Sequence, residues 1–298
     1  MSKLLRCVPV LLLMPLFIAG CTGAKSEQNQ EQERHNWQTE NLKGAVKSYT
    51  QSIYKATDMF GKIEKGDRGF STYFLEDDLR NITATYNEKG NLIEVSEYNP
   101  ISGSLSQKTN FLYDDNGKQI EENSYDADGV LEGKKKLLYD EKGKLTEINT
   151  YAADSSLAEK VTFVYDEKGN QIERNRYMPD GSLNWREKYA YNEKGYIVEK
   201  IVSVLEDVFL QKSKFTYDKS GNRIEVSISE QDGLKKANGK IAYDDEGNPV
   251  EWSSLDSEGN TKEGKFTYQY DKKGNWTQMV IYKNGIPKNI VEREYTYY

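Results

Sequence analysis

A short turn signal recurs along most of this chain at a nearly fixed interval. Each copy is a tyrosine followed at once by Asp or Asn and, four residues after the tyrosine, by Gly. Successive copies are 26 or 27 residues apart. They begin at Tyr86, Tyr113, Tyr139, Tyr165, Tyr191, Tyr217, Tyr243 and Tyr270. A fixed period of this length marks a repeat protein, in which each repeat is one supersecondary unit that stacks on its neighbours.

Each repeat is predicted to form two antiparallel strands. About twelve residues after the first turn signal comes a second one, such as Asp128-Gly129 or Asp180-Gly181. Asp and Asn hydrogen-bond their own backbone, and Gly adopts the positive φ that closes a short hairpin. The runs between turns are rich in Val, Ile, Thr, Tyr and Phe, which favour strands. The sequence therefore predicts an all-β fold, an antiparallel β-meander of about eight 26-residue two-strand repeats.

One face of this sheet is expected to be apolar. Suppose that each repeat tyrosine pairs with the residue five positions after it. The residue two positions before the tyrosine then faces the residue seven positions after the tyrosine. Leucines eight before the tyrosines, such as Leu105 and Leu131, then extend the same face. The register predicts the pairs Phe111–Ile120, Phe163–Ile172, Tyr189–Val198, Phe215–Ile224 and Ile241–Val250.

The opposite face carries rows of charge. The position eight after each repeat tyrosine reads Glu94, Glu121, Glu147, Glu173, Glu199, Glu225, Glu251 and finally Gln278. Their predicted partners across the second turn are Lys108, Lys134, Lys160, Arg186, Lys212, Asn238 and Lys265. Cross-strand pairs of this kind each stabilise a sheet by about 0.2–1 kcal/mol. We therefore interpret the glutamates as structural and predict no metal site.

The N-terminus has the pattern of a bacterial lipoprotein. Lys3 and Arg6 precede an apolar run that is too short to span a bilayer, and the run ends in residues 18–21, with the letters IAGC, which resemble a lipobox. We predict a signal peptide over residues 1–20, lipidation of Cys21 and a flexible polar tether over residues 21–41. Residues 42–85 are irregular relatives of the repeats and are expected to cap the repeat domain, residues 86–298.

Composition narrows the possible functions. The net charge of −7 argues against nucleic acid as a partner. No cysteine follows Cys21 and the only histidine is His35, in the tether, so the cysteine and serine nucleophile schemes lack a nucleophile or a base. We predict a non-catalytic protein without a cofactor.

Aromatic side chains are the candidate binding residues. A second tyrosine column, twelve residues after the repeat tyrosines, falls by parity on the charged face. Amphipathic rings on a rigid sheet suit protein partners or sugar stacking, although tyrosine also simply fits a half-buried strand. The candidates are Tyr98, Tyr125, Tyr151 and Tyr177, together with Trp185, Trp252 and Trp276. The tyrosine column is interrupted by Ser203, Ser229 and Leu255 and resumes at Tyr282.

The letters YDEKGNQI at Tyr165–Ile172, and their copies between Tyr86 and Tyr298, resemble the YD repeats of Rhs-type and teneurin-type proteins. The resemblance implies a coiled β-sheet shell whose repeats carry no catalytic residues. A sheet this wide rarely stays flat, and its apolar face needs cover, so an open spiral, a flattened two-layer tube or a barrel is expected. We favour a coiled sheet with the Glu and Lys rows outside and an edge near residues 290–298 that needs shielding or recruits a partner strand.

Two functions remain open from the sequence. The first is a lipid-anchored module that binds a protein or glycan partner at the cell envelope. The second is a passive structural or assembly component of an envelope complex. The lipid on Cys21 would hold either one at a membrane facing away from the cytoplasm, with the outer membrane favoured and the periplasmic or surface-exposed side left open.

Overall fold

The computed structural model describes residues 36–69, 79–205, 208–230, 235–256 and 258–298. Its nineteen strands belong to one antiparallel sheet. They are β1 (Val46–Met59), β2 (Lys62–Arg68), β3 (Ile82–Tyr86), β4 (Leu92–Tyr98), β5 (Leu105–Tyr113), β6 (Gln119–Asp126), β7 (Leu131–Tyr139), β8 (Leu145–Ala152), β9 (Leu157–Tyr165), β10 (Gln171–Tyr177), β11 (Leu183–Tyr191), β12 (Ile197–Val204), β13 (Val208–Tyr217), β14 (Arg223–Ser229), β15 (Lys235–Tyr243), β16 (Pro249–Asp256), β17 (Thr261–Tyr270), β18 (Trp276–Lys283) and β19 (Ile286–Tyr297). The predicted all-β meander of two-strand repeats is confirmed.

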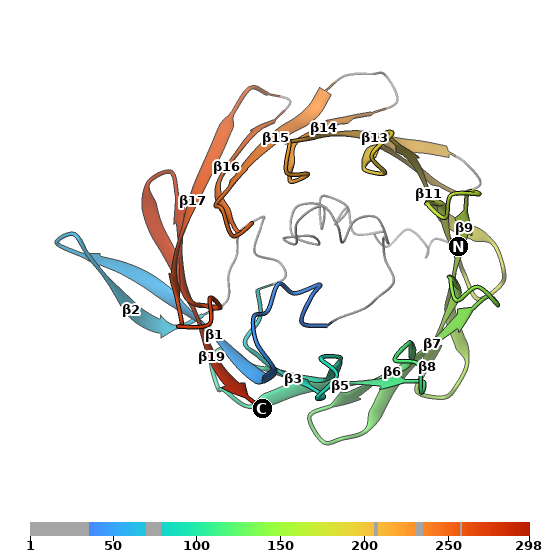
Figure 1. Cartoon of the computed structure of the whole chain (residues 1–298), viewed down its shortest axis with the longest axis horizontal. Coiled ribbons are helices and arrows are strands. Elements are labelled where there is room, and N and C mark those ends of the chain that lie inside the picture. The colour runs from blue at the N-terminus through green and yellow to red at the C-terminus, as the bar shows by residue number, and fades with distance from the viewer. Residues whose placement is uncertain (1–35, 70–78, 206–207, 231–234, 257) are drawn as a thin grey trace, which may run out of the picture.

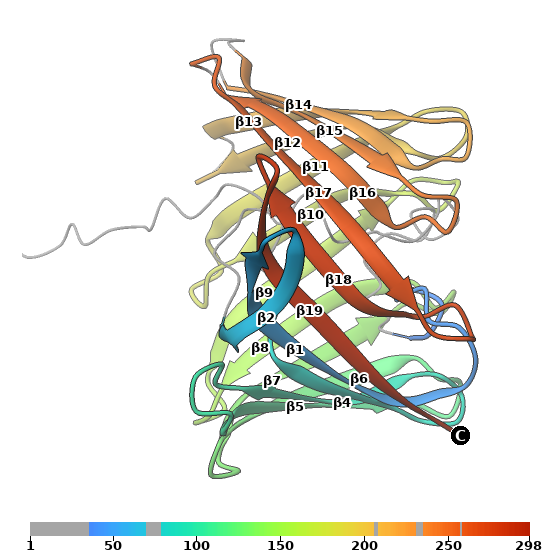
Figure 2. The ribbon, with the colours of Figure 1, turned by 90° about the vertical axis from the view of Figure 1, so that its left-hand side faces the viewer.

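The sheet closes on itself into a barrel (Figure 1). From β3 to β19 each strand pairs with the next, and β1 pairs with β3 on one side and with β19 on the other. The strands cross the barrel wall at a slant (Figure 2). The region expected to cap the repeats therefore supplies the closing strand. The edge expected near residues 290–298 is also absent, because β1 covers β19 from Val46 to Lys55.

The strand β2 stands apart from the ring. It pairs with the end of β1 from Tyr54 to Met59, and the resulting hairpin projects outward from the wall (Figures 1 and 2). Its root is fixed to the barrel by Lys65, which forms an ion pair of 2.8 Å with Glu292 and lies 4.9 Å from the centre of the Tyr54 ring. At its tip, Phe60 is fully exposed and has a φ of 57°.

The first turn of each repeat is held by the Asp or Asn that follows the repeat tyrosine, as predicted. In the turn after β5, Asp114 Oδ1 accepts hydrogen bonds from the backbone N–H groups of Asn116 (3.0 Å) and Lys118 (2.8 Å). Gly117 has a φ of 77°, which an L side chain rarely adopts. The same bonding of one side-chain oxygen recurs at Asp126, in the second turn.

The predicted register across the first turn is wrong, by one residue at the repeat tyrosine and by two residues beyond it. Tyr113 pairs with Gln119, and Leu112 pairs with Glu121, so Ile120 is the extra residue of a β-bulge. Phe111 therefore faces Glu122 rather than Ile120, and the other four predicted apolar pairs shift in the same way. A bulge adds one residue to one strand, and the strict alternation used for the prediction fails there.

Six of the eight repeat tyrosines, together with Tyr268 and Tyr295, form a ladder on the inner face of the barrel. Each of these eight hydroxyls donates to a backbone carbonyl of the preceding repeat at 2.5–3.0 Å. The donor–acceptor pairs are Tyr113–Leu92, Tyr139–Gln119, Tyr165–Leu145, Tyr191–Gln171, Tyr217–Ile197, Tyr243–Arg223, Tyr268–Pro249 and Tyr295–Trp276. In the last two of these pairs, the donor tyrosine therefore stands two residues before the position that the repeat period predicts.

The segment 36–44 identifies the inner face, because it lies inside the ring (Figure 1). Glu40 accepts hydrogen bonds from the hydroxyls of Tyr49 (3.3 Å) and Tyr86 (2.7 Å), and Trp37 Nε1 donates to the Val46 carbonyl (2.7 Å). Residues 36–41, expected to be the end of the flexible tether, are therefore packed against the barrel. Side chains on the alternate face point outward.

Candidate functional site

The outer face carries the Glu and Lys rows, as predicted. Five of the seven predicted partners form ion pairs with their glutamates, at 2.6–3.5 Å. The pairs are Glu94–Lys108, Glu121–Lys134, Glu147–Lys160, Glu173–Arg186 and Glu199–Lys212. The strand register places each pair on a diagonal rather than directly opposite; Glu121, for example, lies opposite Lys136.

Asparagines two residues after the glutamates hold the carboxylates in place. Asn123 Nδ2 donates to Glu121 Oε1 at 2.8 Å, and Asn149 Nδ2 donates to Glu147 Oε1 at 2.6 Å. The hydrogen bond from Asn123, together with Lys134, lowers the pKa of Glu121 below its ordinary value. These glutamates therefore remain ionised and paired at neutral pH.

The four candidate tyrosines form an arc on the outer face, just before the second turns. We call Tyr98, Tyr125, Tyr151 and Tyr177 the tyrosine arc. All four rings are half-buried. Each lies opposite a leucine on the next strand, and three also lie opposite a lysine on the preceding strand. The leucines are Leu105, Leu131, Leu157 and Leu183, and the lysines are Lys108, Lys134 and Lys160.

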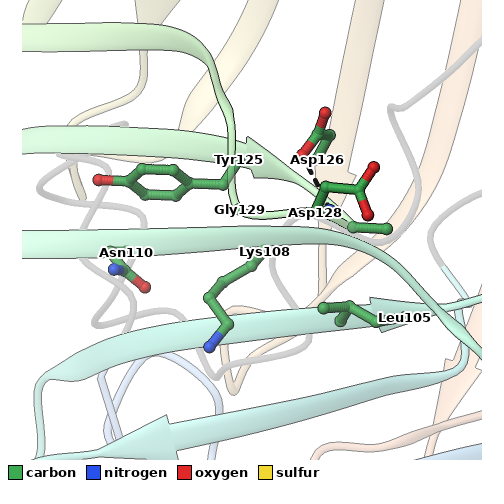
Figure 3. A pocket seen from close by; sticks show the side chains of 8 residues that line it. Leu105, Lys108, Asn110, Tyr125, Asp126, Asp128 and Gly129 are labelled. Carbon is green, nitrogen blue, oxygen red and sulfur yellow. Dashed lines mark hydrogen bonds between the residues drawn. The ribbon is translucent and has the colours of Figure 1, made fainter.

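A shallow hollow of about 380 Å³ lies beside Tyr125 (Figure 3). Leu105 and Lys108 of β5 form one side of it, and the turn that contains Asp126 and Asp128 forms the other. Leu105 was expected to extend the apolar inner face. A bulge in the pairing of β4 with β5 instead sets it opposite Tyr98, and it lines the hollow together with Lys108 and Tyr125. The hollow thus combines an aromatic ring, an aliphatic side chain, a cation and two carboxylates.

The three candidate tryptophans do not join the arc. Trp252 is 9% exposed and packs in the core against Phe266 and Met279. A Cβ at Gly264 would lie only 2.1 Å from Trp252 Nε1, so this strand position requires glycine. Trp276 packs against the same core cluster, and the centre of its ring lies 4.0 Å from the Arg293 guanidinium carbon.

Trp185 lies on the inner face, opposite Arg176 of β10 and Val204 of β12. Its parity is that of the repeat tyrosines, so it points away from the arc. The packing of Trp252 and Trp276 explains these two rings without a ligand. The sequence rule that grouped the tryptophans with the arc used ring type alone, whereas the strand parity separates them.

A charged cluster on the inner face was not predicted. Glu187, which is 6% exposed, pairs with Lys200 at 3.1 Å and with Arg174 at 3.5 Å, and it accepts a hydrogen bond of 2.8 Å from the Tyr189 hydroxyl. Burial alone would raise the pKa of Glu187, but the charges of Lys200 and Arg174 outweigh it and lower the pKa. The sequence does carry a sign of this cluster, because its charged residues stand at positions that the predicted register assigns to the apolar face.

Two negative findings apply to the described residues. These residues contain no group of three or more His, Cys, Asp or Glu side chains that would hold a metal ion. In the same part of the chain, no helix is long and apolar enough to cross a membrane. The predicted signal peptide and Cys21 lie outside the described residues.

Solved structures similar to this chain include toxin components and porin-like proteins. The Tc holotoxin pore of Photorhabdus luminescens matches 71% of this chain at 16% identity, with a TM-score of 0.35, and this chain spans 12% of that one. A porin-like protein from Bacteroides uniformis matches 84% of this chain and 98% of its own at 10% identity, with a TM-score of 0.42. A porin-like protein from Bacteroides vulgatus matches 66% of this chain and 96% of its own at 13% identity, with a TM-score of 0.39. At these TM-scores the likenesses support no argument about function.

A search of curated proteins finds no match. The family model described as the teneurin YD-shell matches residues 70–297, which contain all eight turn signals and the complete tyrosine ladder. This chain therefore belongs to the teneurin YD-shell family.

Proposed function

We propose that this chain is a lipid-anchored, non-catalytic module of the bacterial cell envelope that binds a partner through the tyrosine arc. The family and the closed sheet support a structural shell-forming module. The lipobox-like sequence before Cys21 supports the anchor, with the outer membrane as the favoured location. The arc supports the binding role.

The observation that carries the binding role is the restriction of the arc to one part of the wall. The tyrosines lie on β4, β6, β8 and β10, the equivalent positions on β12, β14 and β16 are Ser203, Ser229 and Leu255, and tyrosine returns at Tyr282 on β18. Glu–Lys pairs continue beyond the arc, for example Glu199–Lys212. A purely structural need for tyrosine would apply to every repeat, so the asymmetry favours a binding side and a bare side.

Site-specific photo-crosslinking in intact cells tests the proposal. A photoreactive amino acid in place of Tyr151 should capture an envelope component, and the same amino acid in place of Ser203 should not. The two positions are equivalent within their repeats, so they lie on different sides of the barrel but are buried to a similar extent. Equal capture at both positions, or none at Tyr151, would contradict a binding role of the arc.

The second candidate function is a passive structural or assembly component. The hydrogen-bonded pairing of β1 with β19 favours this structural function, since a sheet that closes into a ring is complete without a further strand. A structural role predicts that removal of one whole repeat, such as residues 191–216, gives a smaller ring that still joins its envelope complex. Loss of assembly with a ring that remains folded would instead show that particular repeats are recognised.

A further inference from the structure

We infer that this chain forms a two-fold symmetric dimer in which the β2 strands of two copies pair edge to edge. The inference concerns the hairpin that projects from the barrel and does not depend on the tyrosine arc. It follows from three features of the hairpin: a free strand edge, one pairing register that matches charge, and an exposed ring at the tip.

The strand β2 offers a free edge. Within the described residues, β1 is the strand that lies along β2. Met59 pairs with Lys62 across a two-residue loop, which makes this the hydrogen-bonded pair next to the turn. Hydrogen-bonded and non-hydrogen-bonded pairs alternate along an antiparallel ladder, so the N–H and C=O groups of Ile63 and Lys65 point away from β1. Backbone groups in this orientation are a template for a further strand.

Charge selects one register for the pairing of two β2 strands. Identical strands can pair antiparallel around a two-fold axis normal to the sheet in three registers that bring the outward groups of Ile63 and Lys65 together. The axis then passes Ile63, Glu64 or Lys65. In the last two registers, the charged residue on the axis lies directly opposite its own copy, which destabilises a sheet. The register with Ile63 on the axis has no such pair.

With Ile63 on the axis, opposite charges face each other. Lys62 of each copy then lies opposite Glu64 of the other copy, and these side chains are 79% and 46% exposed in the single chain. Within one copy, Lys62 Nζ already lies 2.8 Å from Glu64 Oε1. Four charges therefore alternate in sign around the axis on one face of the junction. On the other face, Ile63 meets its own copy.

The neighbouring positions fit the same register. Lys65 lies opposite Gly61 of the second copy, so it keeps its ion pair with Glu292. Phe60 comes next to Gly66 of the second copy, which has no side chain to obstruct the ring. In the single chain, Phe60 is fully exposed at a positive φ, a conformation that costs free energy and is typical of functional positions. The dimer gives this ring a surface to cover.

The shape of the hairpin leaves room for two barrels. β19 covers β1 only as far as Lys55, and the hairpin beyond that residue stands clear of the wall (Figures 1 and 2). Ala56 and Lys65 form the first pair of the free part, two residues from Ile63. Two residues of strand rise on each side of the axis hold the walls about 14 Å apart. The shared strip is short, so we expect a reversible dimer rather than a permanent one.

Sedimentation velocity of the processed chain, residues 21–298 with C21A, tests the inference. We expect a monomer that dimerises as the protein concentration rises. K62E and E64K each set like charges opposite at two symmetric positions, and each should weaken dimerisation by about tenfold. The double variant K62E/E64K exchanges the charges, restores opposite signs and should dimerise like the parent. I63P removes an outward N–H that β1 does not use, so it should abolish the dimer and keep the β-sheet signal in circular dichroism.

A cysteine at the axis checks the register. No cysteine follows Cys21, so I63C supplies the only thiol of the C21A chain. It should form a disulfide with its own copy under mild oxidation, because directly opposite residues of paired strands meet the required Cα separation. D58C is the matched control, since Asp58 lies opposite Ile63 on the other strand of the same hairpin. D58C should not cross-link.

The outcomes leave no intermediate result. A parent chain that stays monomeric up to about 1 mM overturns the inference. A dimer that K62E and I63P leave unchanged, or equal cross-linking of D58C and I63C, also overturns it, because the contact then lies elsewhere. A double variant that stays as weak as K62E would contradict the register. Capture at Tyr151 is a separate measurement, so the binding role of the arc and the dimer can each fail alone.

Discussion

The hydroxyl of Tyr165 donates a hydrogen bond of 2.7 Å to the backbone carbonyl of Leu145, which begins a strand of the preceding repeat. This contact gives the repeat tyrosine a second role besides starting the turn. Its backbone opens one hairpin while its side chain ties that hairpin to the one before. Leu145 is fully buried, so the bond satisfies a carbonyl at a position that water does not reach.

Replacement of Tyr165 separates the hydroxyl from the ring. Y165F should lower the free energy of unfolding by about 1 kcal/mol, because the Leu145 carbonyl loses its donor. Y165A should cost about 3–5 kcal/mol, because the ring packs against the cluster that includes Phe163. Urea unfolding followed by circular dichroism measures both values. Y151F, on the outer face, is the control and should change stability by less than about 0.5 kcal/mol.

Stability should fall steeply at alkaline pH. Burial raises the pKa of six phenols above the ordinary value of 10.0, in the case of Tyr297 to about 12 with help from Asp271. They are Tyr49, Tyr86, Tyr113, Tyr270, Tyr295 and Tyr297. The pKa of each of these phenols is higher in the folded state than in the unfolded state. Their contribution to stability is therefore fully present below the pKa of the unfolded state, and it is lost as the pH rises from that value toward the pKa of the folded state.

The measurement is a pH titration that follows tyrosinate absorbance and circular dichroism together. These phenols should ionise only as the barrel unfolds, above about pH 10. Ionisation of all tyrosines near pH 10 with an intact β-sheet signal would show that the buried phenols are accessible.

The hairpin tip should be stabilised by a smaller or more permissive residue. Phe60 has a φ of 57° and makes no use of its ring for packing, because the residue is fully exposed. Asn tolerates this backbone conformation better than Phe, so F60N should raise the free energy of unfolding by up to about 1 kcal/mol. Thermal unfolding of F60N and F60G checks this. A lower melting temperature for both would mean that the Phe60 ring contributes to the fold.

The inner charged cluster should make stability sensitive to acid. E187Q removes the charge that Lys200 and Arg174 share, and we expect a cost of about 3 kcal/mol at neutral pH. The folded pKa of Glu187 is lowered, so its contribution is present above the unfolded pKa of the carboxyl group and disappears as pH falls through the folded value. The stability gap between E187Q and the parent should therefore close below about pH 4. A gap that does not change with pH would assign the cost to packing.

The lipid anchor gives a prediction about location. C21A should move the chain from the membrane fraction to the soluble fraction, because the lipid is the proposed attachment. Protease treatment of intact cells that carry the parent chain then distinguishes the two faces of the outer membrane. Loss of the repeats, while a periplasmic control protein survives, indicates surface display. C21A that stays in the membrane fraction would contradict the anchor.

Much of this fold follows from the spacing of the turn signals. The period fixes the number of strands and the position of each turn, and the Glu and Lys rows follow from it because ion pairs tolerate diagonal geometry. Lys134 reaches Glu121 even though Lys136 lies directly opposite. The apolar pairs are less tolerant, and they were misassigned because a bulge at positions such as Ile120 adds a residue that alternation does not foresee.

Closure was left open by the sequence for a different reason. The strand that closes the barrel, β1, lies in the irregular region before the first repeat, and nothing in its residues identifies Tyr295 or Val291 as neighbours. In the same way, alternation could not place Leu105, which a bulge sets beside the outer tyrosines. The period carries no information about either the strand that closes the barrel or the bulge that moves Leu105.

The pairing of β1 with β19 also has a consequence for the order of folding. Contacts such as the hydrogen bond from Arg293 to Gln51 join residues that are 242 positions apart. During synthesis, β1 is made first and its permanent neighbour on that side is made last. Each intermediate hairpin can form from local contacts, but the final closure has to wait for β19 and to overcome a large loop entropy. The nascent sheet therefore has two unpaired edges until β19 has been made, and this interval is when the sheet is most exposed to misassociation.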